Sequence, residues 1–329
     1  MKKLQVSYAG HLSDRVQDLY YGKVQPEGID LYFIPLQPFE AFNRMLRGEF
    51  HCGEMSFSTY VIKVAQKDLP FIAIPVFPSR TFRHSAIYVN RHAGITEPQQ
   101  LAGRRVGVPE YQMTAAVWAR GMLQHEYEVK PEDIKWVTGG LKDPGRKPMV
   151  PLTIPGVDIQ YMENRTLDEM LVSGEIDALI APQMPPSFRA GHENVSYLFP
   201  NYPDVEREYY RKTGIFPIMH VVVLHKRFYE EHPWAAVSLY QAFEQAKENC
   251  LRSLNVEEPL PVSLPWIYNF TKSVQGLMGS DYWPYGIEKN RMVIEALCQY
   301  TWEQGLVPSK VGIDELFAPN VVKLSEYRL

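Results

Sequence analysis

Two arginines and a histidine are crowded together just after an apolar stretch of the sequence. Arg80, Arg83 and His84 follow the run from Phe71 to Phe77, which is typical of a strand buried on both faces. A guanidinium group binds a carboxylate through two parallel hydrogen bonds, so two arginines here suit a ligand with more than one acidic group. The alternative is that both arginines are solvated or ion-paired at the surface. We take Arg80 and Arg83 as candidate substrate-binding residues.

Three residues are candidates for acid–base catalysis. His84 and His220 lie in the two segments where the chain is expected to cross between lobes, and histidine exchanges protons near neutral pH. Glu54 lies at the carboxyl end of an expected strand, where it can accept a hydroxyl proton or act as a general acid. A structural role is the alternative for each histidine, and Glu54 equally fits a residue that holds an arginine in place.

Three polar residues are further candidates for substrate binding. Ser56 follows the strand that carries Glu54. Gln112 and Thr114 lie at a strand-to-helix turn, where unpaired backbone N–H groups favour an anion. Plain helix capping is the alternative role for Thr114.

The common cofactor and metal motifs are missing from the sequence. HExxH, Walker, GxSxG and GxGxxG patterns do not occur, and Cys52, Cys250 and Cys298 are isolated from one another. That spacing fits reduced, buried thiols better than a disulfide framework or a zinc site. We therefore expect neither a metal nor a cofactor.

Composition and charge exclude several classes of protein. The 329 residues include 34 basic and 38 acidic side chains, which gives a net charge of −4 without a basic stripe, so nucleic acid is not an expected partner. No apolar run approaches the roughly 18 to 20 residues that span a bilayer. The first residues enter a strand-like segment without a signal-peptide pattern, so we expect a cytoplasmic protein.

Strand and helix patterns alternate along the chain, as in an α/β fold. Strands are expected at 4–9, 29–34, 71–77, 105–108 and 218–224, and helices at 14–21, 114–124, 233–254 and 287–304. A strand–helix–strand pattern beginning at Gly28 recurs at Gly156. In the second copy, Thr166 and Glu169 have the spacing of a capping box. The recurrence indicates a similar unit in each of two lobes.

The expected organisation has two lobes with a ligand cleft between them. Lobe I comprises residues 1–85 and 218–329, and lobe II comprises residues 86–217. Chain crossings at 85–90 and 216–224 would form the hinge of a clamp. A small, acidic molecule is the expected ligand.

This pattern resembles the type II periplasmic-binding-protein fold, in which each lobe has a mixed sheet flanked by helices. Within that fold, several strings resemble the 4,5-dihydroxyphthalate decarboxylase family. They are the residues 77–85, 103–110, 114–118 and 213–220 together with Tyr209 and Tyr210. The resemblance spans nearly the whole chain.

Membership of this family would imply the loss of one carboxylate from a dihydroxyphthalate, giving protocatechuate and carbon dioxide without a cofactor. Arg80 and Arg83 would then bind carboxylates, and His84 and His220 would transfer protons. Glu54 would bind the catechol hydroxyls or act as the general acid. The resemblance also implies a homo-oligomer.

Two other functions fit the same fold, because function depends on the site rather than on the architecture. The first is a non-catalytic binding protein for an aromatic acid. The second is another enzyme on this fold, from thiamine-precursor or menaquinone synthesis. The first would carry an export signal, and a thiamine-precursor enzyme would carry a cysteine-rich motif, neither of which is seen in this sequence.

Overall fold

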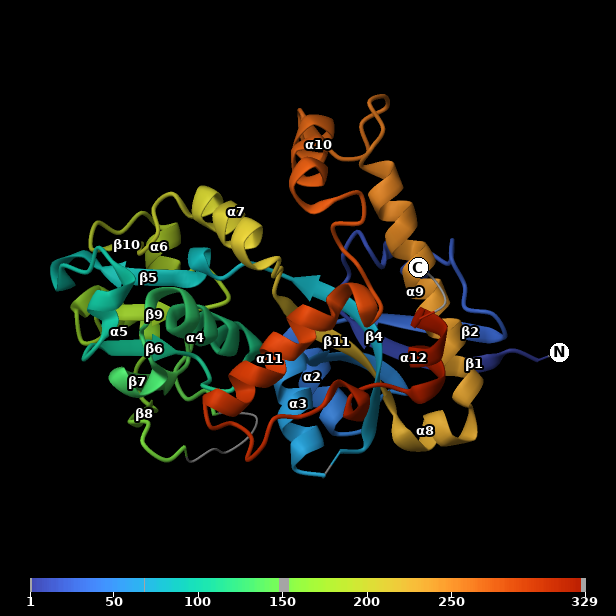
Figure 1. The fold of residues 1–329 in the computed structure, drawn as a ribbon, viewed down its shortest axis with the longest axis horizontal. Coiled ribbons are helices and arrows are strands. Elements are labelled where there is room, and N and C mark those ends of the chain that lie inside the picture. The colour runs from blue at the N-terminus through green and yellow to red at the C-terminus, as the bar shows by residue number, and fades with distance from the viewer. Residues whose placement is uncertain (1, 68, 148–153, 327–329) are drawn as a thin grey trace.

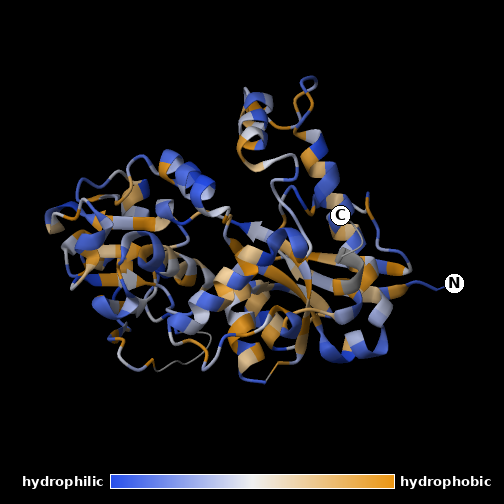
Figure 2. Cartoon of the chain, in the orientation of Figure 1, coloured by the Kyte–Doolittle hydropathy of each residue, from blue (hydrophilic) through white to orange (hydrophobic). Residues whose placement is uncertain are grey.

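The chain folds around two β-sheets, seen at the left and right of Figure 1. The structure is a computed structural model, and it describes residues 2–67, 69–147 and 154–326. Figure 2 shows hydrophobic residues concentrated on the strands of both sheets and on the helices that cover them. The larger of two hydrophobic cores extends from the first sheet into the second lobe, so side-chain packing joins the lobes.

The first sheet has the strand order β2-β1-β3-β11-β4. Its strands are β1 (Leu4–Gly10), β2 (Ile29–Pro35), β3 (Cys52–Ser56), β4 (Phe71–Arg80) and β11 (Ile218–His225). β1 is parallel to β2 and β3, whereas β11 is antiparallel to both of its neighbours. Strand β11 therefore returns from the second lobe to the middle of this sheet.

The second sheet has the strand order β10-β5-β9-β6-β7-β8. Its strands are β5 (Ile87–Asn90), β6 (Arg105–Val108), β7 (Lys135–Gly139), β8 (Ile159–Met162), β9 (Ala178–Ile180) and β10 (Val195–Tyr197). β5 is antiparallel to its neighbours, and the pairs from β9 to β8 are parallel. Parallel strands with helices on their faces require apolar runs such as Ala178–Ile180, which is fully buried.

Helices cover both sheets. They are α1 (Gln17–Tyr20), α2 (Pro38–Leu46), α3 (Phe57–Ala65), α4 (Thr114–Tyr127), α5 (Leu167–Ser173), α6 (Pro186–Arg189), α7 (Tyr202–Thr213), α8 (Lys226–Glu231), α9 (Pro233–Ser253), α10 (Ile267–Met278), α11 (Arg291–Glu303) and α12 (Pro319–Glu326). The expected helix 14–21 is a single turn that no side chain caps, and the expected start at residue 287 is a 3-10 turn before α11. The expected capping box of α5 is present between Thr166 and Glu169.

The recurrence in the sequence corresponds to β2-α2-β3 in the first lobe and β8-α5-β9 in the second. The two units differ in their sheets. One strand lies between β2 and β3, whereas two strands lie between β8 and β9. The second lobe thus has an extra parallel strand between the two strands of its unit, which the sequence comparison of the two copies did not predict.

The chain passes between the sheets in two short segments, 81–86 and 214–217. The expected crossings at 85–90 and 216–224 were placed too far along the chain, because β5 and β11 each pair within a single sheet. Thr81 N donates to Pro217 O at 3.1 Å, so the two segments lie side by side. Helix α11 runs between the lobes in Figure 1 and packs on α3 and α4.

All three cysteines are free and buried. Within the described ranges, no helix combines the length and apolar character needed to cross a bilayer.

Candidate active site

A cavity of about 400 Å³ lies where the two lobes meet. The first lobe and the crossings line it with side chains from α2, β3, β4, the 81–83 segment and β11, and the second lobe contributes the start of α4 and three loops. The lining residues are Gln37, Pro38, Phe39, Phe42, Ser56, Ser79, Thr81, Arg83, Pro109, Glu110, Met113, Thr114, Ala115, Leu141, Arg146, Pro182, Gln183, Met219 and His220. The mixture of apolar walls and a few polar groups is typical of a small-molecule site.

A carboxylate–imidazole pair lies at this cavity. His220 Nδ1 is 2.9 Å from Glu54 Oε2, and His220 lines the cavity. In the β3–β11 register, His220 is opposite Ser56 and Val222 is opposite Glu54, so Glu54 and His220 are diagonal neighbours on one face of the sheet. Pairing between β11 and β4 is irregular on both sides of His220. The edge of the Phe42 ring packs on the imidazole, with ring centroids 4.9 Å apart.

Glu54 is held by groups from the end of β1. Its Oε1 accepts a hydrogen bond from His11 N at 3.0 Å and a longer one from the Tyr8 hydroxyl at 3.5 Å. A Cβ at Gly10 would lie 2.6 Å from the Tyr8 hydroxyl oxygen and 2.9 Å from Glu54 Oε1. Only glycine fits here, and the carboxylate is fixed with one oxygen toward His220. This geometry suits a histidine that donates a proton while a carboxylate orients its ring.

Arg83 is a buried cation at the cavity wall, with 7% of its surface exposed. Its Nε has no hydrogen-bond partner among the described residues, and its Nη2 contacts the sulfur of Met219. Burial lowers the pKa of this guanidinium to about 10, although the charge of Glu206 opposes the change. A buried guanidinium without a bound carboxylate calls for an anionic ligand.

A cluster of hydroxyl groups joins the two lobes beside His220. Ser56 Oγ lies 2.8 Å from Thr114 Oγ1, and Thr59 Oγ1 donates to Ser56 Oγ at 3.1 Å. Ser58 N donates to Thr114 Oγ1 at 3.1 Å. Ser56 and Thr114 both line the cavity, so the structure brings these two predicted residues together with Glu54, His220 and Arg83.

Three predicted residues, Arg80, His84 and Gln112, do not line the cavity. Arg80 is not in the cavity wall: its guanidinium donates to Phe216 O at 2.9 Å, to Pro284 O at 2.8 Å and to Asn290 Oδ1. Burial lowers the pKa of Arg80 to about 9. Successive side chains of a strand point to opposite faces, so Arg80 points away from the cleft that Ser79 lines. Arg80 instead links one crossing segment to residues 284–290.

His84 is also outside the cavity and does not meet His220. Its ring packs on Tyr127, Phe199 and Tyr209 at centroid distances of 5.1 to 6.2 Å. Neither ring nitrogen has a hydrogen-bond partner in the described part of the chain, and burial lowers the pKa to about 4. The expectation that two hinge histidines approach each other is wrong, because residue 84 turns into the aromatic core of the second lobe.

Gln112 is buried behind the cavity wall rather than in it. Its Nε2 donates to Glu110 Oε2 at 2.7 Å. Glu110 Oε1 accepts from Nε of Arg146 at 2.9 Å and also from its Nη2. The sequence analysis did not predict Arg146, because this residue lies in a loop with no strand or helix pattern around it. The charged Glu110 in the turn before α4 was the available signal that a basic partner lies nearby.

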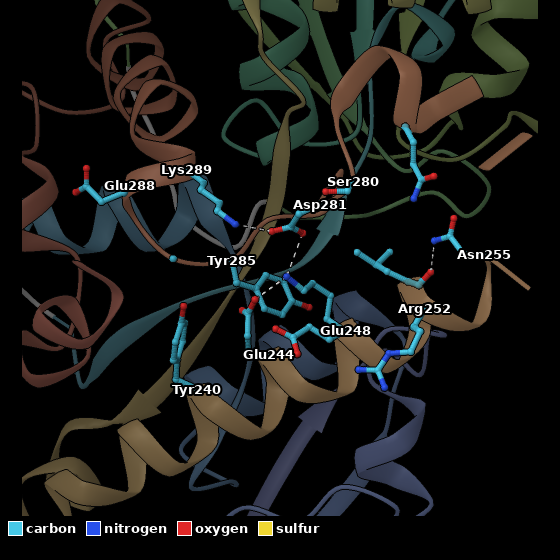
Figure 3. Close-up of a pocket in the computed structure, with 14 residues that line it drawn as sticks. Tyr240, Glu244, Glu248, Arg252, Asn255, Ser280, Asp281, Tyr285, Glu288 and Lys289 are labelled. Carbon is cyan, nitrogen blue, oxygen red and sulfur yellow. Dashed lines mark hydrogen bonds and ion pairs between the residues drawn. The ribbon is translucent and has the colours of Figure 1, made fainter. Parts of the chain in front are cut away.

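A larger cavity of about 500 Å³ lies between α9 and the segment 275–289 (Figure 3). Its buried Lys247 is paired with Glu244 at 2.6 Å and Asp281 at 3.1 Å, and Asp281 also binds Lys289 at 3.0 Å. These charges neutralise one another, whereas Arg83 in the inter-lobe cavity has no carboxylate partner among the described residues. We therefore place the candidate site between the lobes. Among the described residues, no three His, Cys, Asp or Glu side chains are grouped to bind a metal ion.

Two curated relatives share 41% sequence identity with this chain. A 4,5-dihydroxyphthalate decarboxylase from Comamonas testosteroni aligns over 322 residues, which are 97% of this chain and 98% of the relative. A protein of the same name from Pseudomonas putida aligns over 214 residues, 64% of this chain and 83% of the relative. No family model matches the sequence.

Solved structures with low sequence identity share the fold. A protein from Bordetella bronchiseptica RB50 has a TM-score of 0.55 at 14% identity, covering 99% of this chain and 98% of its own. The periplasmic aliphatic sulphonate binding protein SsuA from Escherichia coli has a TM-score of 0.51 at 13% identity, covering 98% of this chain and 99% of its own. The desulfurization enzyme DszB has a TM-score of 0.50 at 15% identity, with 99% of both chains covered. The expected two-lobed, periplasmic-binding-protein-like α/β fold is confirmed.

Proposed function

The chain belongs to the 4,5-dihydroxyphthalate decarboxylase family, and from this premise we propose that it converts 4,5-dihydroxyphthalate into protocatechuate and carbon dioxide in the inter-lobe cavity. One observation carries the proposal beyond the family name. The Glu54–His220 pair and the buried Arg83 line or adjoin the same cavity. Decarboxylation of an aromatic acid needs a group that transfers a proton, and a buried cation without a carboxylate partner among the described residues suits an acidic substrate.

The reaction replaces a carboxylate by a proton at one ring carbon. The hydroxyl group para to the departing carboxylate supplies electron density, and a proton adds to the carbon that bears that carboxylate. The C–C bond then breaks, carbon dioxide leaves, and the bonding electrons restore the aromatic ring. One proton is consumed for each carbon dioxide released, so the site needs a proton donor that is protonated again between turnovers.

We assign that donor to His220. Its Nδ1 is engaged by Glu54 at 2.9 Å, which leaves Nε2 as the nitrogen that transfers the proton. Glu54 orients the ring and stabilises the imidazolium, and the hydrogen bond from His11 N fixes the carboxylate. Fixed geometry of this kind contributes to catalysis because no reorganisation is needed during proton transfer.

Arg83 is the proposed receptor for the carboxylate that is retained. A departing carboxylate must lose its charge, so a tight ion pair to it would stabilise the starting state more than the transition state. The departing group is therefore placed away from Arg83, in a part of the cavity that also has apolar side chains such as Phe42 and Met113. Ser56 and Thr114 supply hydroxyl groups for the phenolic oxygens.

The test is direct turnover. Purified protein treated with EDTA is mixed with 4,5-dihydroxyphthalate, and carbon dioxide and protocatechuate are followed over time together with the melting temperature. We expect both products in equal amounts. A thermal shift without product would refute the decarboxylase and favour a binding protein for an aromatic acid.

We also propose that the enzyme is cytoplasmic, needs no cofactor and forms a homo-oligomer. Helix α10 projects from the first lobe in Figure 1, and the exposed apolar residues Trp266, just before this helix, and Phe270, within it, support an oligomer. Light scattering on the purified protein measures the assembly, and a monomer at all concentrations would refute it.

A further inference from the structure

The inter-lobe cavity contains a second arginine, which the proposed function does not yet use. Arg146 lies in the loop after β7, lines the same cavity as Arg83, and has a side chain that is 29% exposed. It comes from the second lobe, whereas Arg83 comes from a crossing segment. The two cations therefore approach a bound ligand from different parts of the chain.

Arg146 is held on one edge by a carboxylate. Glu110 is 1% exposed, and its Oε1 accepts hydrogen bonds from both Nε and Nη2 of Arg146. The other oxygen of Glu110 accepts from Gln112 Nε2 at 2.7 Å, and Gln112 is itself 1% exposed. A buried amide thus fixes a buried carboxylate, and the carboxylate fixes the guanidinium.

The other edge of the Arg146 guanidinium has no hydrogen-bond partner in the part of the chain that the structure describes. A guanidinium has five N–H donors, and a side-on pair with one carboxylate uses Nε and one Nη. In the described residues, Nη1 of Arg146 makes no hydrogen bond. The guanidinium carbon lies 4.3 Å from the centre of the Phe39 ring on α2 of the first lobe, so the group is placed over the cavity between the lobes.

We propose that Arg146 binds the second carboxylate of the substrate and makes the site select an ortho-dicarboxylate, with Glu110 and Gln112 as positioning residues. This inference rests on the proposed function for the identity of the substrate. Because Glu110 partly neutralises Arg146, the second carboxylate is held less tightly than the one at Arg83. A weaker hold suits the carboxylate that departs as a neutral molecule.

The test compares two ligands that differ by one carboxylate. Phthalate and benzoate lack the hydroxyl groups that drive decarboxylation, so their dissociation constants are measured by calorimetry without turnover. The quantity of interest is the ratio of the benzoate constant to the phthalate constant. Arg146→Gln is expected to lower this ratio about 10- to 100-fold, as for loss of a charge-assisted hydrogen-bonded pair, with benzoate binding nearly unchanged.

Arg165→Gln is the matched control. Arg165 is in the same lobe, is paired with Glu175 and does not line the cavity, so the ratio should stay at the wild-type value. If Arg146→Gln weakens both acids equally or leaves the ratio unchanged, the proposal is wrong. Failure of the wild-type protein to prefer phthalate would also overturn it.

The positioning role is tested by a double-mutant comparison. The single variant Glu110→Ala should lower the ratio of the two dissociation constants. The double variant Glu110→Ala with Arg146→Gln should have the same ratio as Arg146→Gln within about twofold, because Glu110 acts through Arg146. If Glu110→Ala does not fold, Glu110→Gln keeps the acceptor oxygen and should keep or raise the ratio. An additive double variant, or a loss in Glu110→Gln, would contradict the positioning role. A wild-type protein that prefers phthalate but releases no carbon dioxide would refute the proposed function and leave this inference standing.

Discussion

At the scale of single residues, the catalytic proposal depends on two side chains that are 166 positions apart in the sequence and 2.9 Å apart in space. Replacing Glu54 by Gln or His220 by Asn should lower kcat about 10²- to 10⁴-fold, the usual contribution of general acid–base catalysis. The double variant should be no slower than the slower single variant, because the two residues act as a unit. Rates of carbon dioxide release measure this.

The control is Glu248→Gln, an exposed carboxyl at the α9 cavity, which should turn over as the wild type does. Additive losses in the double variant would mean that Glu54 and His220 act independently, contrary to the assignment of one as the orienting partner of the other.

His84 has a structural effect that depends on pH. Burial lowers its pKa from 6.5 to about 4 in the folded protein. Between these values the unfolded chain binds more protons, so the free energy of unfolding falls as pH drops from about 6.5 to 4, by at most about 3 kcal/mol. His84→Leu should remove this part of the pH dependence.

Urea denaturation at pH 7.5 and pH 5 measures the difference for wild type, His84→Leu and the exposed control His192→Leu. The wild type and the control should lose similar stability at pH 5, and His84→Leu should lose less. Equal losses in all three proteins would show that His84 is not a buried neutral histidine.

At the scale of elements, helices α4 and α11 fix how the lobes meet. Trp118 Nε1 on α4 donates to Ile218 O at 2.8 Å. Gln304 lies just after α11; its Oε1 accepts a hydrogen bond from Arg120 Nε, and its Nε2 donates to Val117 O, each at 2.9 Å. The Tyr300 ring of α11 packs against Gly121 of α4. The absence of a side chain at residue 121 is what permits this close approach.

Gly121→Ala would place a methyl group inside the volume of the Tyr300 ring. We expect a loss of about 1 to 3 kcal/mol in the free energy of unfolding, despite the better helix propensity of alanine. Gly276→Ala in α10 is the control, because no atom lies within 4 Å of the added Cβ; it should stabilise by up to about 1 kcal/mol. Equal effects in urea denaturation would contradict the packing argument.

At the scale of the whole molecule, Arg83 illustrates a conflict between stability and function. Its guanidinium is buried, and none of the residues that the structure describes gives it a carboxylate partner, which costs free energy in the unliganded protein. Arg83→Met replaces the buried charge by an apolar side chain of similar length and should therefore raise the free energy of unfolding by about 1 kcal/mol, a gain typical of single stabilising substitutions.

The same variant should lose its response to ligand. Phthalate at 100 times its dissociation constant should stabilise the wild type by about 2.7 kcal/mol and should not stabilise Arg83→Met. Arg47→Met, at an exposed position in the first lobe, should respond as the wild type does. A stable Arg83→Met that still binds phthalate tightly would remove Arg83 from the site.

The sequence by itself determined the class of fold and the strands that carry the site. Short apolar and strand-like runs identified β1, β2, β4 and β11 to within a few residues, because burial in a sheet leaves a local pattern in the sequence. The family strings identified the relatives. The candidate site residues included Glu54, Ser56, Arg83, Thr114 and His220, which the structure brings together.

Only the tertiary structure decided which of the predicted residues face the cavity. Arg80 and Arg83 are three residues apart, yet one fastens a crossing to the 284–290 segment and the other lines the cleft. His84 turns into an aromatic core, and Gln112 lies behind Glu110. Arg146 reaches the site from a loop without any local pattern. Side-chain direction at the end of a strand depends on register, bulges and packing with distant segments, and none of these is encoded within a few neighbouring residues.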